Sequence, residues 1–109
     1  MKYKLKLLPI VYQDLRKAKE WYNIKNIKLG TDFKLKVNEE FEYIRQYPKH
    51  YQKRYEELRQ AIVTRFPYSI YYLIEEDLKQ IVVLGVLAHK QSFEEIKKRL
   101  KFIQEEKSA

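Results

Sequence analysis

The chain has 109 residues, a length that fits a single domain with one hydrophobic core. Lys and Arg number 23 against 15 Asp and Glu, so the net charge is +8, which favours an anionic partner. There is no Cys and there are only two Gly and two His, which excludes disulfides, thiolate zinc sites, a glycine-rich phosphate loop and a multi-His metal cluster, so we expect no metal and no cofactor.

The first predicted element is a strand over residues 2–7. Tyr3, Leu5 and Leu7 alternate with three lysines, so one face is apolar and the other is charged. No apolar run approaches the roughly 20 residues that span a bilayer, and no signal-peptide core follows Met1. We therefore expect a cytoplasmic protein that does not contact a membrane.

Two helices should follow the strand. Pro9 suits the first turn of a helix, because its missing N–H would have no helical partner there. Residues 23–30 are the predicted turn, and the second helix should end near Pro48. Two helices joined by so short a link are expected to pack as an antiparallel hairpin. The apolar stripes that predict them are Val11, Leu15, Ala18 and Tyr22 in the first helix, and Leu29, Phe33, Val37, Phe41 and Ile44 in the second.

Beyond the helices the apolar period changes to two, which predicts a strand over residues 55–65. Residues 68–74 are rich in β-formers and residues 81–87 are almost all apolar, and each is predicted to be a further strand. Their short links indicate an antiparallel meander. In the first of these strands, Leu58 and Ile62 share one face. The other face carries Arg59, Ala61, Val63 and Arg65.

The last predicted element is a helix over residues 92–106. Ser92 to Glu95 has the pattern of a capping box, in which the Ser side chain accepts a hydrogen bond from the backbone N–H of Glu95 and the Glu95 carboxylate reaches back. The element order is therefore β-α-α-β-β-β-α.

This order predicts one α+β domain over residues 1–109, with an antiparallel sheet of about four strands. The helix hairpin should cover one face of the sheet, because so small a sheet is not stable uncovered. We expect the other face to be open and to be bordered by Arg59, Arg65 and the residues around His89.

Positive charge gathers in residues 45–65, which hold six cations and two anions interleaved with Tyr47, Tyr51 and Tyr55. Cations neutralise phosphates and rings stack on bases, so the pattern is typical of a surface for single-stranded nucleic acid. Tyrosines also serve as half-buried packing, and this alternative stays open.

Several short segments, spread over nearly the whole chain up to about residue 90, occur in a characteristic order. They are Ala18 with Trp21-Tyr22, Leu29-Gly30 with Phe33 and Val37, Ile44 with Tyr47-Pro48, Arg59-Gln60-Ala61, Arg65-Phe66-Pro67-Tyr68, Ile70-Tyr71-Tyr72 and residues 83–89. In these segments the chain resembles the RelE/ParE superfamily of bacterial toxins from type II toxin–antitoxin systems, often called plasmid stabilisation proteins. The resemblance implies a cytoplasmic toxin that a cognate antitoxin neutralises by wrapping around it.

The superfamily implies two targets. RelE-like members are endonucleases that cut mRNA on the ribosome, whereas ParE-like members poison DNA gyrase and carry no recognised nuclease residues. Only side chains can separate the two classes, because they share a fold. Outside both stands a different hypothesis, a small nucleic-acid-binding or protein-interaction module without toxicity.

Resemblance to the nucleases implies roles for individual residues. Arg65 stands where they place a phosphate-stabilising arginine, and Arg59 shares its predicted face and could hold a neighbouring phosphate. His89 and Lys90 are the candidates for proton transfer, since an imidazole titrates near neutral pH. The alternative for the arginines is pairing with Glu57 or with the acidic turn.

The nuclease resemblance is incomplete at the tail. The nucleases have a tyrosine and further arginines just beyond the last strand, where this chain has acids and a helix cap in residues 91–96. The basic loop that contacts RNA in the nucleases corresponds to Lys49, Lys53 and Arg54, which are our candidate nucleic-acid-binding residues. Ribosome-bound mRNA and DNA gyrase both remain as possible targets.

Overall fold

The computed structural model describes residues 2–89 and 92–108 and contains three α-helices and a five-stranded sheet. The elements in chain order are β1 (Lys4–Leu7), α1 (Pro9–Lys25), α2 (Ile27–Gln46), β2 (Lys53–Tyr55), β3 (Leu58–Ile62), β4 (Tyr68–Glu75), the 3-10 turn η1 (Glu76–Leu78), β5 (Gln80–Ala88) and α3 (Ser92–Ser108). The predicted α+β class and the order of the predicted elements are confirmed.

The sheet has the strand order β1-β5-β4-β3-β2. The predicted meander is confirmed, because β3, β4 and β5 pair antiparallel. The prediction of an antiparallel sheet of about four strands was wrong in two details. β1 pairs parallel with β5. The predicted strand over residues 55–65 is two strands, because a turn at Glu56 and Glu57 separates the short edge strand β2 from β3, which ends at Ile62. The alternation of residues 2–7 predicts a strand but does not identify the strand with which it pairs. The sequence therefore could not show that β1 runs parallel to its neighbour.

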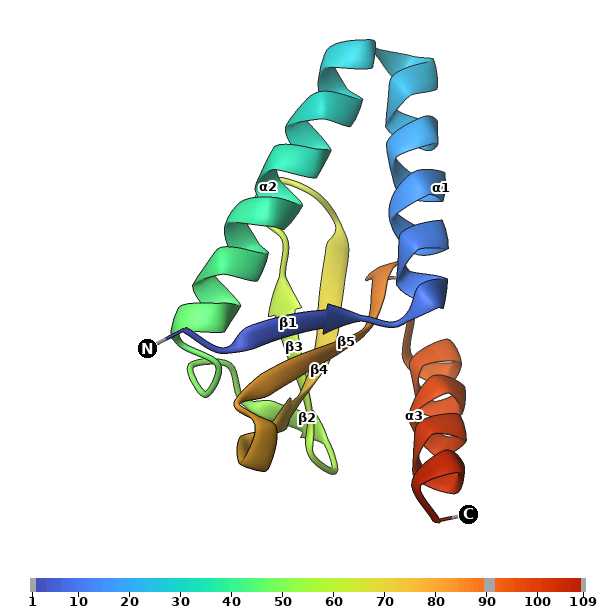
Figure 1. Cartoon of the computed structure of the whole chain (residues 1–109). Coiled ribbons are helices and arrows are strands. Elements are labelled where there is room, and N and C mark those ends of the chain that lie inside the picture. The colour runs from blue at the N-terminus through green and yellow to red at the C-terminus, as the bar shows by residue number, and fades with distance from the viewer. Residues whose placement is uncertain (1, 90–91, 109) are drawn as a thin grey trace.

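The helix hairpin is longer than predicted, because the turn at residues 23–30 shrinks to Asn26. Its backbone N–H closes α1 by donating to the Tyr22 carbonyl at 2.9 Å. Its side chain accepts from the Lys28 N–H at 2.9 Å and so caps α2. In Figure 1 the two helices form a V whose tip points away from the sheet.

The main core lies between the hairpin and one face of the sheet. Both predicted stripes contribute to it, and the sheet supplies alternate residues of β3, β4 and β5. Fully buried members include Val11, Phe33, Ile44, Ala61 and Tyr72. The helical pattern therefore identified residues that the hairpin buries. The period-two pattern grouped Ala61 with Val63 correctly, but their face, which we predicted to be open, lies under the hairpin.

The opposite face of the sheet is not open, which corrects a prediction. α3 packs on it with Ile96 and Leu100, which are 0% and 3% exposed, against Leu58, Tyr71 and Leu84. The apolar stripe of α3 needs a surface to bury against, and this face is the one the hairpin leaves uncovered. The helix itself extends past the predicted residue 106.

Candidate functional site

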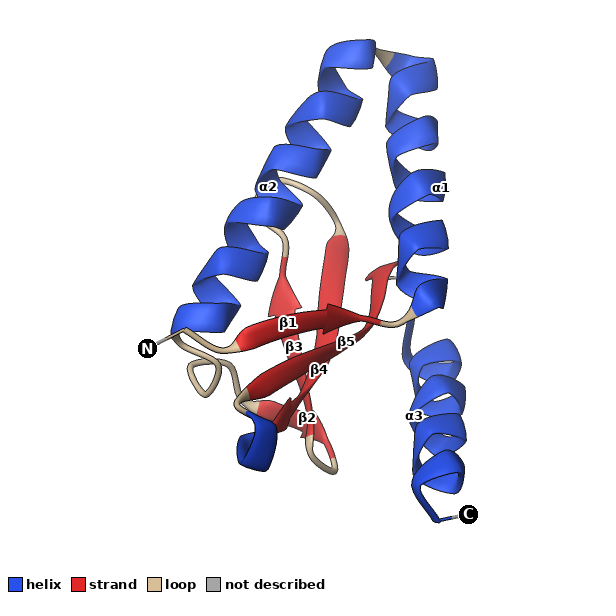
Figure 2. Cartoon of the chain, viewed as in Figure 1, coloured by secondary structure: helices blue, strands red, loops and turns tan. Residues whose placement is uncertain are grey.

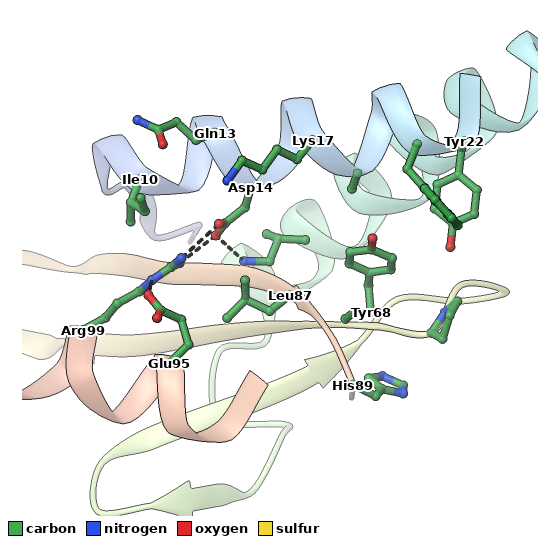
Figure 3. A pocket seen from close by; sticks show the side chains of 15 residues that line it. Ile10, Gln13, Asp14, Lys17, Tyr22, Tyr68, Leu87, His89, Glu95 and Arg99 are labelled. Carbon is green, nitrogen blue, oxygen red and sulfur yellow. Dashed lines mark hydrogen bonds and ion pairs between the residues drawn. The ribbon is translucent and has the colours of Figure 1, made fainter. Parts of the chain in front are cut away.

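A groove of about 720 Å³ lies between α1, the end of β5 and α3 (Figure 3). Its apolar lining includes Ala18, Trp21 and Tyr22 from α1 and Tyr68 from β4, and His89 borders it at the end of β5. Burial raises the pKa of the Tyr22 and Tyr68 phenols. The groove is therefore lined by neutral rings.

The floor of the groove is an edge of the sheet beside which no strand lies within residues 2–89 and 92–108. β1 accompanies β5 only from Gln80 to Val83, and the chain then turns into α1. Beyond Val83, two side chains form hydrogen bonds with the backbone at the edge of β5. Asp14 accepts a hydrogen bond from the Val86 N–H at 3.1 Å, and Arg99 donates to the Leu84 carbonyl at 2.9 Å.

Asp14 and Arg99 also bind each other. Arg99 Nη1 and Nη2 donate to Oδ2 and Oδ1 of Asp14 at 2.7 and 3.0 Å (Figure 3). The Asp14 side chain is 8% exposed and the Arg99 side chain is 11% exposed. Glu95 accepts from Arg99 Nε at 2.9 Å. Burial disfavours the charge on Arg99, but the hydrogen bonds and charges of Asp14 and Glu95 outweigh it, so the pKa of Arg99 is raised. We call this pair the Asp14–Arg99 clasp; it joins α1, β5 and α3.

Gly85 makes room for the clasp. The register between β4 and β5 shifts here, so that Leu84 and Gly85 together oppose one step of β4. A Cβ at Gly85 would lie 2.9 Å from Arg99 Nη1 and 2.8 Å from Ile96 Cδ1. The bulge and the missing side chain bring Arg99 down onto the strand edge.

We did not predict the clasp from the sequence, although it left a signal there. Asp14 lies three residues after Val11 and four before Ala18, so it interrupts the apolar stripe of the first helix. Arg99 interrupts the stripe of the last helix in the same way, between Ile96 and Ile103. Charged residues at two core positions indicate a buried pair.

The structure separates the candidate catalytic residues. Arg59 and Arg65 do not border one open face, because Arg59 extends from the face that packs under the hairpin. Its Nη1 donates to the Tyr51 carbonyl at 2.5 Å, so it holds the segment before β2. Four residues of extended strand, about 13 Å, separate Arg59 from Val63, where the turn to β4 begins.

Arg65 and His89 lie at the other end of the sheet. Arg65 is exposed in the turn between β3 and β4 and has a left-handed φ of 74°. His89 is also exposed, and its backbone N–H donates to the Pro67 carbonyl of the same turn at 3.0 Å. Lys90, the other candidate for proton transfer, lies outside the described residues, as does the Ser92 side chain of the expected capping box.

The candidate nucleic-acid-binding residues lie in β2 and in the segment just before it. Lys49 and Lys53 are 65% and 48% exposed and pair with Glu76 and Glu57 at 3.3 and 2.9 Å. Arg54 is exposed and lies over the Phe93 ring of α3 at 5.7 Å. The predicted pairing partner Glu57 therefore binds Lys53 in this structure.

Within residues 2–89 and 92–108, the side chains form no group of three or more His, Cys, Asp or Glu able to hold a metal ion. The helices of this part of the chain are too short or too polar to cross a membrane.

Comparison with known proteins agrees with this architecture. No curated protein matches the chain. One similar solved structure is the chromosomal ParDE toxin–antitoxin system from P. aeruginosa, with 16% sequence identity, a TM-score of 0.69, and coverage of 80% of this chain and 96% of that one. Another is a double-arginine mutant of the E. coli toxin RelE in the free state, with 14% identity, a TM-score of 0.67, and coverage of 91% and 94%. At such identities, the likeness shows the fold.

A family model settles the membership that the fold leaves open. The model of the ParE toxin of the type II toxin–antitoxin system parDE matches residues 5–93, which span β1 to the first turn of α3. This range is most of the chain and includes the hairpin, the whole meander and the part of the groove lining that lies before α3. The chain therefore belongs to the ParE toxin family of type II toxin–antitoxin systems.

Proposed function

We propose that this toxin arrests growth by poisoning DNA gyrase and does not cut mRNA. The observation that carries the proposal is the separation of Arg59 from Arg65 and His89. The proposed target places the toxin in the cytoplasm.

Cleavage of RNA by its 2′-OH requires a base, a cation on the phosphorane and an acid for the leaving oxygen, all within reach of one phosphate. Arg59 lies under the hairpin, at the end of β3 away from Arg65, where it donates to the backbone carbonyls of Lys49 and Tyr51. Its role in this structure is to position a loop. A phosphate held near Arg65 and His89 would lie beyond its reach.

One observation favours the second candidate, ribosome-dependent mRNA cleavage. Arg65 and His89 lie at the same end of the sheet, because the His89 N–H donates to the Pro67 carbonyl in the turn that contains Arg65. A cation and an imidazole near each other are part of a nuclease site. The experiment must therefore test these two residues directly.

Purified full-length chain should inhibit supercoiling by gyrase and increase the amount of cleaved plasmid. In cells, induction should stop growth and leave the mRNA ends on ribosomes unchanged. The double variant Arg65→Ala/His89→Ala should stay as toxic as the wild-type chain. Ribosome-dependent mRNA cuts that this variant abolishes would overturn the proposal, and a chain that leaves growth, supercoiling and mRNA unchanged would favour the non-toxic binding module.

For the antitoxin, we propose that an amphipathic, acidic segment docks in the groove between the hairpin and the edge of β5. The support is the edge of β5 beyond Val83, where the pairing with β1 ends, the ring of Trp21 (54% exposed) and the cation Lys17 at the rim. Trp21→Glu replaces the exposed ring at the rim with a charge that repels an acidic segment, and should weaken antitoxin binding while leaving gyrase inhibition intact. Unchanged affinity would exclude the groove.

A further inference from the structure

The end of the helix hairpin carries apolar side chains that the fold does not bury. We call residues 21–29 the hairpin tip; Figure 2 shows α1 and α2 in blue, meeting at a point that stands clear of the red strands. Ile24 and Ile27 are 83% and 76% exposed, the two highest values among the large apolar side chains of residues 2–89 and 92–108. Neither belongs to a core cluster. Their apolar surface is therefore available to a partner.

The hairpin tip has a fixed shape. Asn26 alone separates the two helices, and it donates to the Tyr22 carbonyl and accepts from the Lys28 N–H, each at 2.9 Å. Gly30 allows the helices to approach closely, since a Cβ there would overlap the Asn23 side chain and lie 3.1 Å from the Lys19 carbonyl oxygen. The exposed isoleucines are thus displayed without a further ordering cost on binding.

Positive charge surrounds the hairpin tip on both helices. Residues 16–34 contain six Lys and Arg and only two acids, Glu20 and Asp32. Within the part of the chain that the structure describes, none of the six cations forms an ion pair, so none has to release a carboxylate in order to bind another anion. An apolar tip surrounded by cations fits a partner that is both apolar and anionic. The six cations are Arg16, Lys17, Lys19 and Lys25 of α1, and Lys28 and Lys34 of α2.

The side chains of the hairpin are ordered along its length as a bilayer surface would require. Counted from Asn26 at 1.5 Å per residue, the two isoleucines lie within about 3 Å, Trp21 at about 8 Å, and Lys19 and Lys34 at about 10 and 12 Å. A bilayer surface has the same order, with acyl chains deepest, then the level that Trp prefers, then the phosphates. Lys25 bends back from the tip, because its Nζ lies 4.7 Å from the centre of the Trp21 ring.

We propose that the hairpin tip inserts shallowly into the surface of a bilayer that contains anionic lipids. Ile24 and Ile27 enter the boundary of the acyl chains, the Trp21 ring lies at the level of the headgroups, and the lysines contact the lipid phosphates. A fluid bilayer adapts to a convex tip, whereas a protein partner would need a matching cleft. A second copy of the chain would bring the same six cations against these, which like charge opposes.

The inference goes beyond the proposed function, since gyrase inhibition requires no lipid. It also replaces our expectation that the chain does not contact a membrane, which rested on spanning segments alone. Shallow insertion needs no spanning helix, and the cytoplasmic leaflet supplies the anionic lipids.

Trp21 is the only tryptophan of the chain, so its fluorescence reports on the hairpin tip directly. The full chain is mixed with vesicles of equal parts phosphatidylcholine and phosphatidylglycerol, and with vesicles of phosphatidylcholine alone. Sedimentation should show at least about tenfold tighter binding to the anionic vesicles. Bound chain should emit at a shorter wavelength than free chain, and lipids brominated on their acyl chains should quench this emission.

Two variants separate the apolar and the charged contributions. Ile24→Ser/Ile27→Ser should weaken vesicle binding at least roughly tenfold, because it removes the side chains that enter the lipid. Lys28→Gln/Lys34→Gln should weaken binding roughly 5- to 30-fold, and less at high salt.

Matched controls remove the same kinds of group elsewhere. Leu78→Ser/Phe102→Ser removes two apolar side chains that are 62% and 61% exposed, and Lys98→Gln/Lys101→Gln removes two exposed cations of α3. The first control should bind vesicles like the wild-type chain, and the second should lose less affinity than Lys28→Gln/Lys34→Gln. Melting curves confirm that each variant is folded, and the Trp21 emission of the wild-type chain tests the proposal without any variant.

The proposal fails if the anionic vesicles bind no more chain than the neutral ones, if Trp21 emission is the same in bound and free chain, or if tip and control variants lose binding equally. A lipid-free dimer that Ile24→Ser/Ile27→Ser separates, without vesicle binding, would identify a contact between copies instead. Tip variants that lose antitoxin affinity, again without vesicle binding, would identify a protein surface. Gyrase assays contain no lipid, so failure here leaves the proposed function standing.

Discussion

Removing one partner of the Asp14–Arg99 clasp should destabilise the toxin more than any exposed ion pair does. Asp14→Ala leaves the guanidinium of Arg99, 11% exposed, with only Glu95 and one carbonyl, and it also removes the acceptor of the Val86 N–H. An uncompensated buried charge costs about 3–5 kcal/mol. The free energy of unfolding of a domain is about 5–15 kcal/mol, so this variant should be close to unfolding at 37 °C.

Two further variants separate the contributions. Asp14→Asn can keep an oxygen for the Val86 N–H, but its amide NH2 replaces the oxygen that accepts from Arg99 Nη2, so it loses the charge and one hydrogen bond. It should cost less than Asp14→Ala, about 2 kcal/mol. The double variant Asp14→Leu/Arg99→Met replaces the pair with apolar side chains and leaves no buried charge, but it also removes the partners of the Val86 N–H and the Leu84 carbonyl. It should therefore cost less than Asp14→Ala, about 1–3 kcal/mol.

Urea unfolding followed by circular dichroism measures these differences, and hydrogen exchange at the Val86 amide reports the lost acceptor separately. As a control, Glu39→Ala breaks the pair with Lys36, in which the carboxylate is 66% exposed, and should cost less than about 0.5 kcal/mol. The reasoning fails if Asp14→Ala costs less than about 1 kcal/mol, or if the apolar double variant is as unstable as Asp14→Ala.

Three further predictions concern the loop before β2, the acidic turn and the bulge. Tyr72→Phe leaves the buried Pro48 carbonyl without its donor and should lower the free energy of unfolding in urea by about 1–3 kcal/mol. Burial raises the pKa of Tyr72 from 10.0 to about 12, so the wild-type chain loses stability as the pH rises from 10 to 12. Tyr72→Phe should lose less stability over the same range, because it has no phenol to ionise. Hydrogen bonds, first from Lys79, lower the pKa of Glu76 from 4.5 to about 2, so the Glu76 carboxylate stabilises the fold above pH 4.5 and this contribution is lost as the pH falls towards 2. Glu76→Gln should lack this pH-dependent contribution. If the stability difference between the two chains does not shrink between pH 4.5 and 2, the prediction is wrong. Gly85→Ala places a methyl group against Arg99 and should lower the free energy of unfolding by about 1–3 kcal/mol. Ala88→Gly, on the same strand, is the control for changes in backbone freedom. Equal stability of Gly85→Ala and the wild-type chain would show that α3 can shift without cost.

The sequence alone determined the local architecture of this protein. Apolar residues at helical spacing predicted both helices of the hairpin, alternation predicted β1 and β3, and runs of β-formers predicted β4 and β5, because periodicity and propensity depend only on neighbouring residues. The same patterns assigned Ala61 and Val63 to one face of β3. The ordered segments also identified the family.

Tertiary structure decided everything that depends on long-range contact. The parallel pairing of β1 with β5, the covering of the second face by α3, and the meeting of Asp14 with Arg99, 85 positions apart, join segments whose local patterns say nothing about each other. Arg59 shows the limit most clearly. Its strand face was predicted correctly, but whether that face lies under the hairpin or towards solvent is set by packing of the whole sheet. For that reason the sequence suggested a phosphate ligand where the fold holds a loop anchor.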